Sequence, residues 1–216
     1  MNFAEYNVKD ANLEEILLAL KSLDTVEAVA LGGSRSTGAS DENSDYDIYV
    51  YCTEIPTAET RENLLGKYCS IAEFGNHYWE SEDNTVMNNG TPVDIIYRDV
   101  DRFGRYIDTV IKGGKAFNGY TTAFWHNIKN SKVLFDKTDT LTKFRDMAQI
   151  DFPENLRSAI IKNNRNLLNG KLPSYDRQIK KAQERGDIVS VNHRITAFLE
   201  SYFDVIFALN RQTHPG

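Results

Sequence analysis

The chain has 216 residues, of which 41% are hydrophobic, and this is enough apolar content for a core in one large domain or two modest ones. A formal net charge of -6 argues against a general nucleic-acid binder. No run of about 18 apolar residues occurs, and the N-terminus lacks a basic stretch followed by an apolar one, so neither a membrane span nor a secretory signal is expected. We therefore expect a cytoplasmic protein.

The charge is divided unevenly along the chain. Residues 1–152 carry 15 basic and 25 acidic side chains, a net of -10, whereas residues 153–216 carry 10 basic and 6 acidic ones, a net of +4. The hydrophobic pattern changes at the same place, from mixed strand and helix periods to helical periods only. We therefore expect a mixed α/β catalytic domain over 1–152 and a helical C-terminal domain over 153–216.

The first part of the chain alternates helical and strand patterns. Asn12 precedes apolar residues at helical spacing, which predicts an amphipathic helix that Asn12 caps. The apolar, β-branched run 26–31 ends at Gly32-Gly33 and predicts a buried strand that leads into a tight turn. Further along we expect strands at 45–52, 93–97 and 132–136, helices at 57–68, from about 100 to Gly113-Gly114 and at 140–148, and a hairpin turn at Asn89-Gly90.

The second part reads as helices over 154–169, 175–185 and 188–210. The last of these carries one apolar stripe, made of Val191, Ile195, Phe198, Leu199, Tyr202, Phe203, Ile206 and Leu209. Such a stripe is expected to be covered, either by a second copy in a homodimer or by helices beyond Gly216, and we favour a chain truncated after Gly216. The opposite face carries His193, Glu200 and Asp204, and it predicts either a cleft wall or a solvent-facing surface.

Two carboxylates in the second expected strand point to a metal site. Asp45 and Asp47 are two residues apart, and the strand period of two places both on one face. Side-by-side carboxylates repel each other, and a shared proton or a bound cation relieves that repulsion. Oxygen ligands of this kind suit Mg²⁺, which prefers a few carboxylates together with phosphate oxygens and water.

A phosphate-binding turn and a third acid accompany this pair. Gly32 and Gly33 follow a strand, where glycines let the backbone approach an anion and where the next N–H groups and the Ser34 hydroxyl can donate to phosphate oxygens. Asp94 lies in an otherwise apolar strand, where a carboxylate is costly unless a cation or hydrogen-bond donors compensate it. Three acids and one phosphate-binding turn indicate a site for a metal-bound phosphate compound.

These residues resemble a known family. The order Gly-Gly-Ser, a ten-residue gap, Asp-x-Asp on a strand and a later strand with a single Asp is similar to the signature of the DNA polymerase β-like nucleotidyltransferases. Within it the chain looks most like bacterial small-molecule enzymes of the aminoglycoside and lincosamide type. The resemblance implies an α+β fold, in which a mixed sheet is flanked by helices and followed by an all-helical domain.

The resemblance also implies a set of roles. Two Mg²⁺ ions, or Mn²⁺, would be held by Asp45, Asp47 and Asp94, and Asp94 would hold the catalytic metal or take the acceptor's proton. A nucleoside triphosphate would rest on the Gly32-Gly33-Ser34 turn. Where many relatives carry an Arg four residues after the motif glycine this chain has Thr37, and Arg35 is either a substitute phosphate contact or a solvated loop residue. Some relatives take a general base from the helical domain, which makes Glu200 and Asp204 candidates.

The implied activity is transfer of a nucleoside monophosphate to a hydroxyl. The donor is expected to be a nucleoside triphosphate, ATP by default, with release of pyrophosphate, and the acceptor a small molecule such as an antibiotic. One alternative is the same chemistry on a protein or an RNA end. A second alternative, from another class, is a catalytically silent nucleotide-binding or interaction module. The sequence fixes neither the acceptor nor the base preference.

Overall fold

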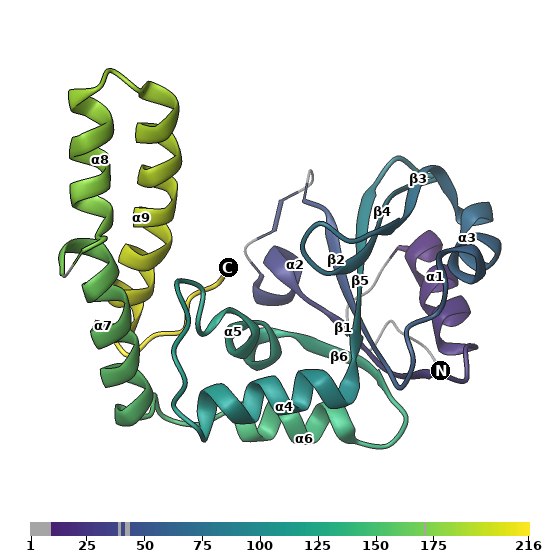
Figure 1. Ribbon diagram of the computed structural model, residues 1–216. Coiled ribbons are helices and arrows are strands. Elements are labelled where there is room, and N and C mark those ends of the chain that lie inside the picture. Colours follow the sequence, from purple (N-terminus) through teal and green to yellow (C-terminus); the bar gives the residue numbers. More distant parts are fainter. Residues whose placement is uncertain (1–9, 39, 42–43, 171) are drawn as a thin grey trace. The chain divides into compact units, whose positions relative to one another are not determined.

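The computed structural model describes residues 10–38, 40–41, 44–170 and 172–216 (Figure 1). The chain divides into two compact units, the first formed by Met1–Arg105 with Lys129–Met147 and the second by Tyr106–Ile128 with Ala148–Gly216. The sequence-based division at Pro153 assigns residues 106–128 to the first domain, whereas they pack within the second unit. The spacing of apolar residues indicates helices and strands, but it does not indicate which unit a helix packs against. The functional division at Pro153 stays a prediction.

A mixed sheet forms the centre of the first unit. In the described part of the chain it has six strands in the order β3-β4-β5-β2-β1-β6. Only the β2–β5 pair is parallel, and the other neighbours run antiparallel. The strands are β1 (Val26–Leu31), β2 (Tyr46–Cys52), β3 (Cys69–Asn76), β4 (Ser81–Met87), β5 (Pro92–Asp99) and β6 (Lys132–Asp136). The α+β class is thereby confirmed, as are the expected strands at 26–31 and 132–136.

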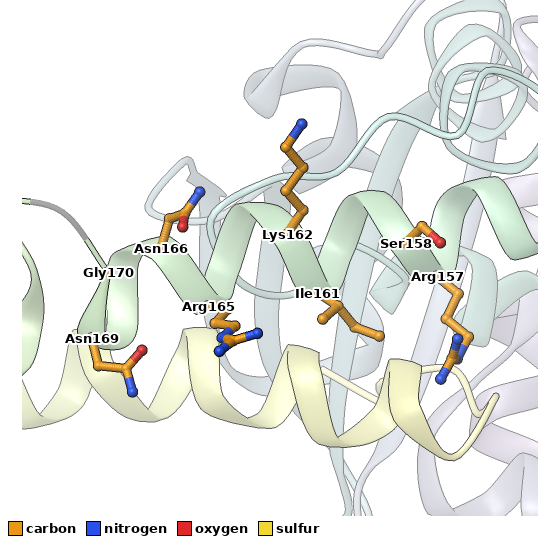
Figure 2. A pocket seen from close by; sticks show the side chains of 8 residues that line it. All are labelled: Arg157, Ser158, Ile161, Lys162, Arg165, Asn166, Asn169 and Gly170. Carbon is orange, nitrogen blue, oxygen red and sulfur yellow. The ribbon is translucent and has the colours of Figure 1, made fainter.

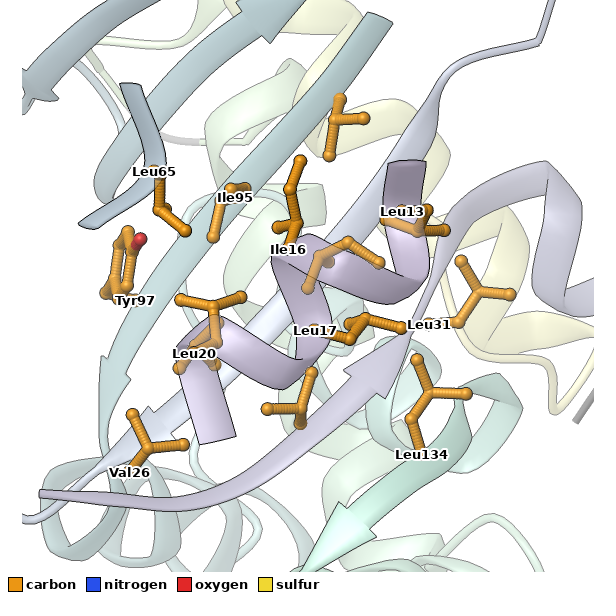
Figure 3. Close-up of a cluster of buried hydrophobic side chains, with 14 of the residues drawn as sticks. Leu13, Ile16, Leu17, Leu20, Val26, Leu31, Leu65, Ile95, Tyr97 and Leu134 are labelled. Atoms are coloured by element: carbon orange, nitrogen blue, oxygen red, sulfur yellow. The ribbon is translucent and has the colours of Figure 1, made fainter. Parts of the chain in front are cut away.

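Helix α1 (Ala11–Lys21) covers one face of this sheet. Leu13, Ile16, Leu17 and Leu20 are buried and pack with apolar side chains from β1, β2 and β5, which Figure 3 shows as one cluster. The predicted cap at Asn12 is wrong. The cap lies two residues earlier, where the Asp10 carboxylate accepts hydrogen bonds from the N–H groups of Asn12 and Leu13. An Asp side chain caps as well as Asn, so residue type alone could not choose between them.

Strand β2 separates the core from the opposite face of the sheet. Ile48 and Val50 belong to the buried cluster beneath α1. Because side chains alternate along a strand, Asp47 and Tyr49 project from the other face. The same alternation in β5 places Ile95 in the core and Asp94 on that other face. The sheet thus has an apolar side covered by α1 and a polar side that carries the candidate site.

Strands β3 and β4 were not predicted, because their pattern is not the usual apolar alternation. The buried positions of β4 include Asp83, which is fully buried and pairs with Arg61 of helix α3 (Ala58–Leu65) at 2.9 Å. A charged residue at a core position hides the strand period. The helix expected over 57–68 ends at Leu65 and continues as a 3₁₀ turn over Gly66–Tyr68. Gly90, with φ of +87°, closes the predicted β4–β5 hairpin.

The remaining helices of the first unit are α2 (Gly33–Thr37), the first part of α4 (Val100–Ile111) and α6 (Thr140–Ala148). The second unit contains α5 (Ala123–Asn130) for most of its length, together with α7 (Glu154–Asn169), α8 (Tyr175–Glu184) and α9 (Ile188–Leu209). Inside this unit the Trp125 indole donates to the Ala148 carbonyl at 2.8 Å and its ring packs 5.2 Å from that of Phe152. Within the described ranges, no helix combines the length and apolar character that crossing a membrane requires.

The buried face of helix α9 is not the one expected from the sequence, because it includes part of the polar side. Its buried residues are Ser201, Asp204 and Ala208, so Asp204 faces neither a cleft nor solvent. The apolar stripe is partly exposed, and Ile195, Leu199, Tyr202, Phe203 and Leu209 each keep between 39% and 48% of their surface. The buried face consists of small residues and one hydrogen-bonded carboxylate. A pattern of apolar residues cannot identify such a face, so the sequence-based assignment of the two faces was wrong.

Candidate active site

The parallel pairing of β2 with β5 brings two of the predicted acids together. Asp47 and Asp94 are direct partners in the register, and both are half-buried. Adjacent strands lie about 4.8 Å apart, so the two side chains leave the sheet as neighbours on one face. The sequence placed Asp94 on a strand but could not show that this strand lies directly beside β2.

Gly32 and Gly33 bring the backbone against the same carboxylate. The Gly32 N–H donates to the Asp47 carbonyl at 2.8 Å. Gly33 has φ of +56°, and a Cβ built on it would lie 1.7 Å from Asp47 Oδ2. Instead of the open turn expected from the sequence, Gly33 begins the five-residue helix α2, and Gly32 occupies its N-cap position. Gly33 is therefore required because the backbone passes directly over the Asp47 side chain at this residue.

The electrostatic environment of Asp47 favours a bound cation. Burial, together with the smaller effect of the Asp45 and Asp94 charges, raises the pKa of its carboxyl to about 6. A carboxylate whose ionised form is disfavoured by burial and by like charges is stabilised when a positive ion joins it. Asp45 is exposed and precedes the first residue of β2, yet its negative charge still contributes to the raised pKa of Asp47.

The chemistry of these residues fits a divalent metal, although they do not form a closed cage. Among the residues that the structure describes, no group of three His, Cys, Asp or Glu side chains is already gathered around one point. Carboxylates with an open side are what Mg²⁺ uses when phosphate oxygens and water complete its shell. The raised pKa of Asp47 and the space that only glycine leaves at position 33 agree with such a half-built site.

Arg35 contacts the backbone that leads into β2. Its Nε donates to the carbonyls of Ser44 and Asp45 at 3.1 and 2.9 Å, Nη2 also donates to the Ser44 carbonyl, and its guanidinium carbon lies 4.0 Å from the centre of the Tyr46 ring. The sequence left Arg35 as a phosphate contact or a solvated residue. The structure instead shows it holding the segment from which the Asp45 side chain projects.

A buried arginine supports the far side of this face. Arg98 binds Glu80 through two nitrogens, with Nε at 2.6 Å from Oε1 and Nη2 at 2.8 Å from Oε2. Its guanidinium carbon lies 4.2 Å from the centre of the Tyr49 ring, and that ring is the group a Cβ on Gly32 would strike. Burial raises the pKa of Tyr49 to about 12, so its hydroxyl stays protonated at neutral pH. Tyr49 is therefore a wall between Arg98 and the glycine segment.

The sequence reasoning missed one residue that touches a predicted acid. Asn84 of β4 donates from Nδ2 to Asp94 Oδ1 at 2.9 Å, and Asn84 and Asp94 are partners in the antiparallel register. The run Ser81-Glu82-Asp83-Asn84 looks like a loop, so its side chains were not placed on a sheet. The signal that could have found it is the hairpin at Asn89-Gly90, since a strand after that turn needs a partner before it.

The candidates from the last helix belong to the second unit. Asp204 accepts hydrogen bonds from the Thr121 N–H at 3.1 Å, the Thr121 hydroxyl at 2.7 Å and Asn164 Nδ2 at 3.0 Å, and it is 1% exposed. Glu200 is half-buried one turn earlier, beside Gly119. A general base needs an oxygen free to accept the acceptor's proton. We therefore retain Glu200 and regard Asp204 as a structural carboxylate.

A basic groove lies along α7. It has a volume of about 600 Å³, and its lining is Arg157, Ser158, Ile161, Lys162, Arg165, Asn166, Asn169 and Gly170, all shown in Figure 2. Three cations and no carboxylate line it, although Arg157 also binds Glu154 at 2.9 Å. Its charge suits an anionic partner.

Comparisons with known proteins match the two parts of the chain to two different families, with bounds that differ from those of the two compact units. Residues 13–117 match a family described as "Nucleotidyltransferase domain", and residues 122–216 match a family described as a domain of unknown function (DUF4037). No curated protein matches the chain significantly. One similar solved structure is described as a nucleotidyltransferase-like protein from Exiguobacterium sibiricum, with a TM-score of 0.45 and 11% identity. That match covers 92% of this chain and 57% of the other, so the chain spans little more than half of that relative's length.

Proposed function

Because residues 13–117 make this chain a member of the DNA polymerase β-like nucleotidyltransferase superfamily, we propose that it moves a nucleoside monophosphate from a nucleoside triphosphate to a hydroxyl of a small molecule. Pyrophosphate is the second product, and ATP is the default donor. The bond that breaks joins the α- and β-phosphates, and the bond that forms joins the α-phosphorus to the acceptor oxygen, whose proton is released.

One observation carries this proposal: Asp47 and Asp94 are in-register neighbours, and Gly33 passes over Asp47 so closely that no other residue fits. A purely structural carboxylate pair would be expected to acquire a proton or a basic partner, because like charges at this distance repel. Instead the only donor to Asp94 among the described residues is the uncharged Asn84. Among the described residues, therefore, no basic side chain is paired with Asp94, and this supports a cation site.

The residues of the chain would divide the work by position. Asp45, Asp47 and Asp94 would hold two Mg²⁺ or Mn²⁺ ions, which would supply positive charge to stabilise the developing negative charge of the transfer. Ser34 and the N–H groups after Gly33 would contact the triphosphate, while Arg35 keeps the Asp45 backbone in place. Asp94 would take the acceptor's proton if no base from elsewhere reaches it, and Glu200 is the candidate base from the helical unit.

A larger, anionic acceptor is the second candidate. The groove along α7 offers Arg157, Lys162 and Arg165 without a carboxylate in its lining, and this charge favours the phosphates of an RNA end over a neutral small molecule. Binding of RNA there should weaken steeply with salt, whereas transfer to a neutral acceptor should not. A protein hydroxyl remains a further acceptor of the same chemistry. The third candidate, a silent nucleotide-binding module, is distinguished by the absence of turnover.

The test is an acceptor screen with radiolabelled triphosphates. Purified protein with Mg²⁺ or Mn²⁺ is offered aminoglycosides, lincosamides and other small polyols, short RNAs and unlabelled proteins, each with four α-labelled triphosphates. Acceptor-dependent pyrophosphate release that disappears in Asp47→Asn supports the proposal and identifies the acceptor class. Tight triphosphate binding without turnover on any acceptor contradicts it and favours the silent module.

A further inference from the structure

Three asparagine-mediated hydrogen bonds lead from the β3–β4 hairpin to the third carboxylate. The Tyr78 N–H donates to Asn76 Oδ1 at 3.0 Å, Asn76 Nδ2 donates to Asn84 Oδ1 at 2.9 Å, and Asn84 Nδ2 donates to Asp94 Oδ1 at 2.9 Å. The residues come from the end of β3, the middle of β4 and the start of β5, which are neighbouring strands. The chain of donors is continuous from one backbone amide to one side-chain carboxylate.

The direction of this chain is fixed at both ends. A backbone N–H can only donate, so the Asn76 atom that faces Tyr78 must be the oxygen, and its NH₂ must face Asn84. The Asn84 atom that receives this donor must then be its oxygen, which leaves the Asn84 NH₂ for Asp94. An ionised carboxylate can only accept, so the other end demands the same orientation. Neither amide can flip without placing two like atoms face to face.

We propose that Asn84 and Asn76 are positioning residues for Asp94 in the nucleotidyl transfer reaction. Asn84 occupies one oxygen of Asp94 and leaves the other, Oδ2, for the metal or for the acceptor's proton. Asn76 acts one step further away, because it keeps the Asn84 amide from turning its oxygen toward the carboxylate. This inference rests on the function proposed above. It adds two residues that lie outside the Gly-Gly-Ser, Asp-x-Asp and single-Asp signature.

The alternative is that the asparagines only hold the hairpin to the sheet. The hairpin already has two other attachments to β5, the Arg98–Glu80 pair at 2.6 Å and the Thr85 hydroxyl that donates to the Val93 carbonyl at 2.8 Å. Losing one amide should therefore leave the hairpin folded. A structural role predicts lower stability with unchanged turnover, whereas a positioning role predicts lower turnover with nearly unchanged triphosphate affinity.

The experiment compares Asn76→Ala, Asn84→Ala and the double variant with a matched control. Asn88→Ala is the control, because Asn88 lies in the turn after β4 and its side chain donates to the Lys67 carbonyl at 3.0 Å, away from the acids. We expect kcat to fall about tenfold in Asn84→Ala and about threefold in Asn76→Ala, the loss that one or two displaced hydrogen bonds produce. Triphosphate affinity should stay within about threefold, and the two effects should not add, because both act through one amide.

A second readout does not depend on activity. The side-chain NH₂ of Asn84 gives its own signals in a ¹⁵N–¹H NMR spectrum, and these should shift in Asn76→Ala, although Asn76 does not touch Asp94, but not in Asn88→Ala. Unchanged Asn84 signals, additive effects, or normal turnover in a folded Asn84→Ala protein would each overturn the proposal. If the wild-type protein transfers no nucleotide to any acceptor, the proposed function fails, and the NMR comparison still decides whether the hydrogen-bonded chain exists.

Discussion

Gly33 and Asp47 occupy a space that holds only one side chain. The backbone of Gly33 lies so near the carboxylate that a Cβ would come within 1.7 Å of Oδ2 and 2.8 Å of the carboxyl carbon. The glycine also has φ of +56°, a conformation that other residues adopt at a cost. The glycine segment proposed to bind phosphate and the carboxylate proposed to bind metal are therefore in direct contact, and a side chain added at Gly33 would displace Asp47.

Gly33→Ala should damage both triphosphate and metal binding. A side chain here would move the N–H groups that are expected to contact the phosphates, and its Cβ would also collide with Asp47. We expect triphosphate affinity to fall at least tenfold, measured by calorimetric titration with Mg²⁺ present. The control is Gly90→Ala, because Gly90 has φ of +87° but open space around it, so it shares the backbone strain without the collision. Equal losses in both variants would contradict this interpretation.

Asp47→Asn should stabilise the metal-free protein at neutral pH and abolish turnover. The folded-state pKa of about 6 lies above the unfolded value of 3.8, so ionising Asp47 opposes folding. This penalty is complete above about pH 6 and absent below about pH 3.8. Asn removes it, and we expect a gain of about 1 kcal/mol at pH 7.5, a solvent-screened fraction of what a two-unit shift could supply. At pH 4 the gain should nearly vanish.

Chemical denaturation in chelator at the two pH values measures this effect. The same variant should lose turnover by a factor on the order of a thousand, comparable to losing a main electrostatic stabiliser. Equal stability of the variant and the wild type at pH 7.5 would show that ionised Asp47 does not destabilise the metal-free protein. A near-normal rate would mean that the site lies elsewhere.

Triphosphate binding should require a divalent ion. Asp45, Asp47 and Asp94 together present negative charge to a polyanion, and the one basic side chain of β2 and β5, Arg98, is bound to Glu80. Calorimetric titration of ATP with Mg²⁺, with Mn²⁺ and with chelator tests this expectation. We expect affinity to drop by at least tenfold in chelator, and equal affinity in all three would contradict a carboxylate metal site.

The sequence predicted the parts of this fold that obey simple periods and missed those that depend on pairing. Strand 26–31 and helix 154–169 were predicted to the residue, because all their buried positions except Asn164 are apolar. Strand β4 was missed because its buried Asp83 is neutralised by Arg61, which lies 22 residues earlier in the chain. The same holds for the site: Asp47 and Asp94 could be chosen by type, but Asn84 acquires its role only when β4 is placed beside β5.

Breaking the buried Arg61–Asp83 pair should cost far more stability than breaking an exposed pair. Both side chains are at most 2% exposed, so Asp83→Ala leaves a buried guanidinium uncompensated, which costs about 3–5 kcal/mol. The matched control is Asp108→Ala, which removes a 2.9 Å pair with Lys112 whose side chains are 51% and 62% exposed. That change should cost less than about 0.5 kcal/mol. Denaturant unfolding of both variants measures the difference, and similar losses would contradict the assigned burial.

The last prediction separates two carboxylates of α9 that the sequence treated alike. Asp204 accepts three hydrogen bonds inside the second unit, so Asp204→Asn should lower stability by about 1–3 kcal/mol, the cost of disturbing a buried and satisfied polar group. Burial raises the pKa of the Asp204 carboxyl, which agrees with its removal from solvent. Its effect on transfer should follow from unfolding alone and disappear at low temperature.

Glu200→Gln should show the reverse pattern if Glu200 is the general base. Glu200 is partly accessible, so its amide variant should keep the wild-type unfolding midpoint and the wild-type triphosphate affinity. Transfer to the true acceptor should fall about a hundredfold, the usual contribution of a general base, and the pH at which the rate is half-maximal should change because the titrating group is gone. Stability curves, calorimetry and a pH–rate profile on both variants decide the matter. If Glu200→Gln transfers at the wild-type rate across the whole pH range, the proton goes to Asp94, and the helical unit contributes to acceptor binding without taking part in the proton transfer.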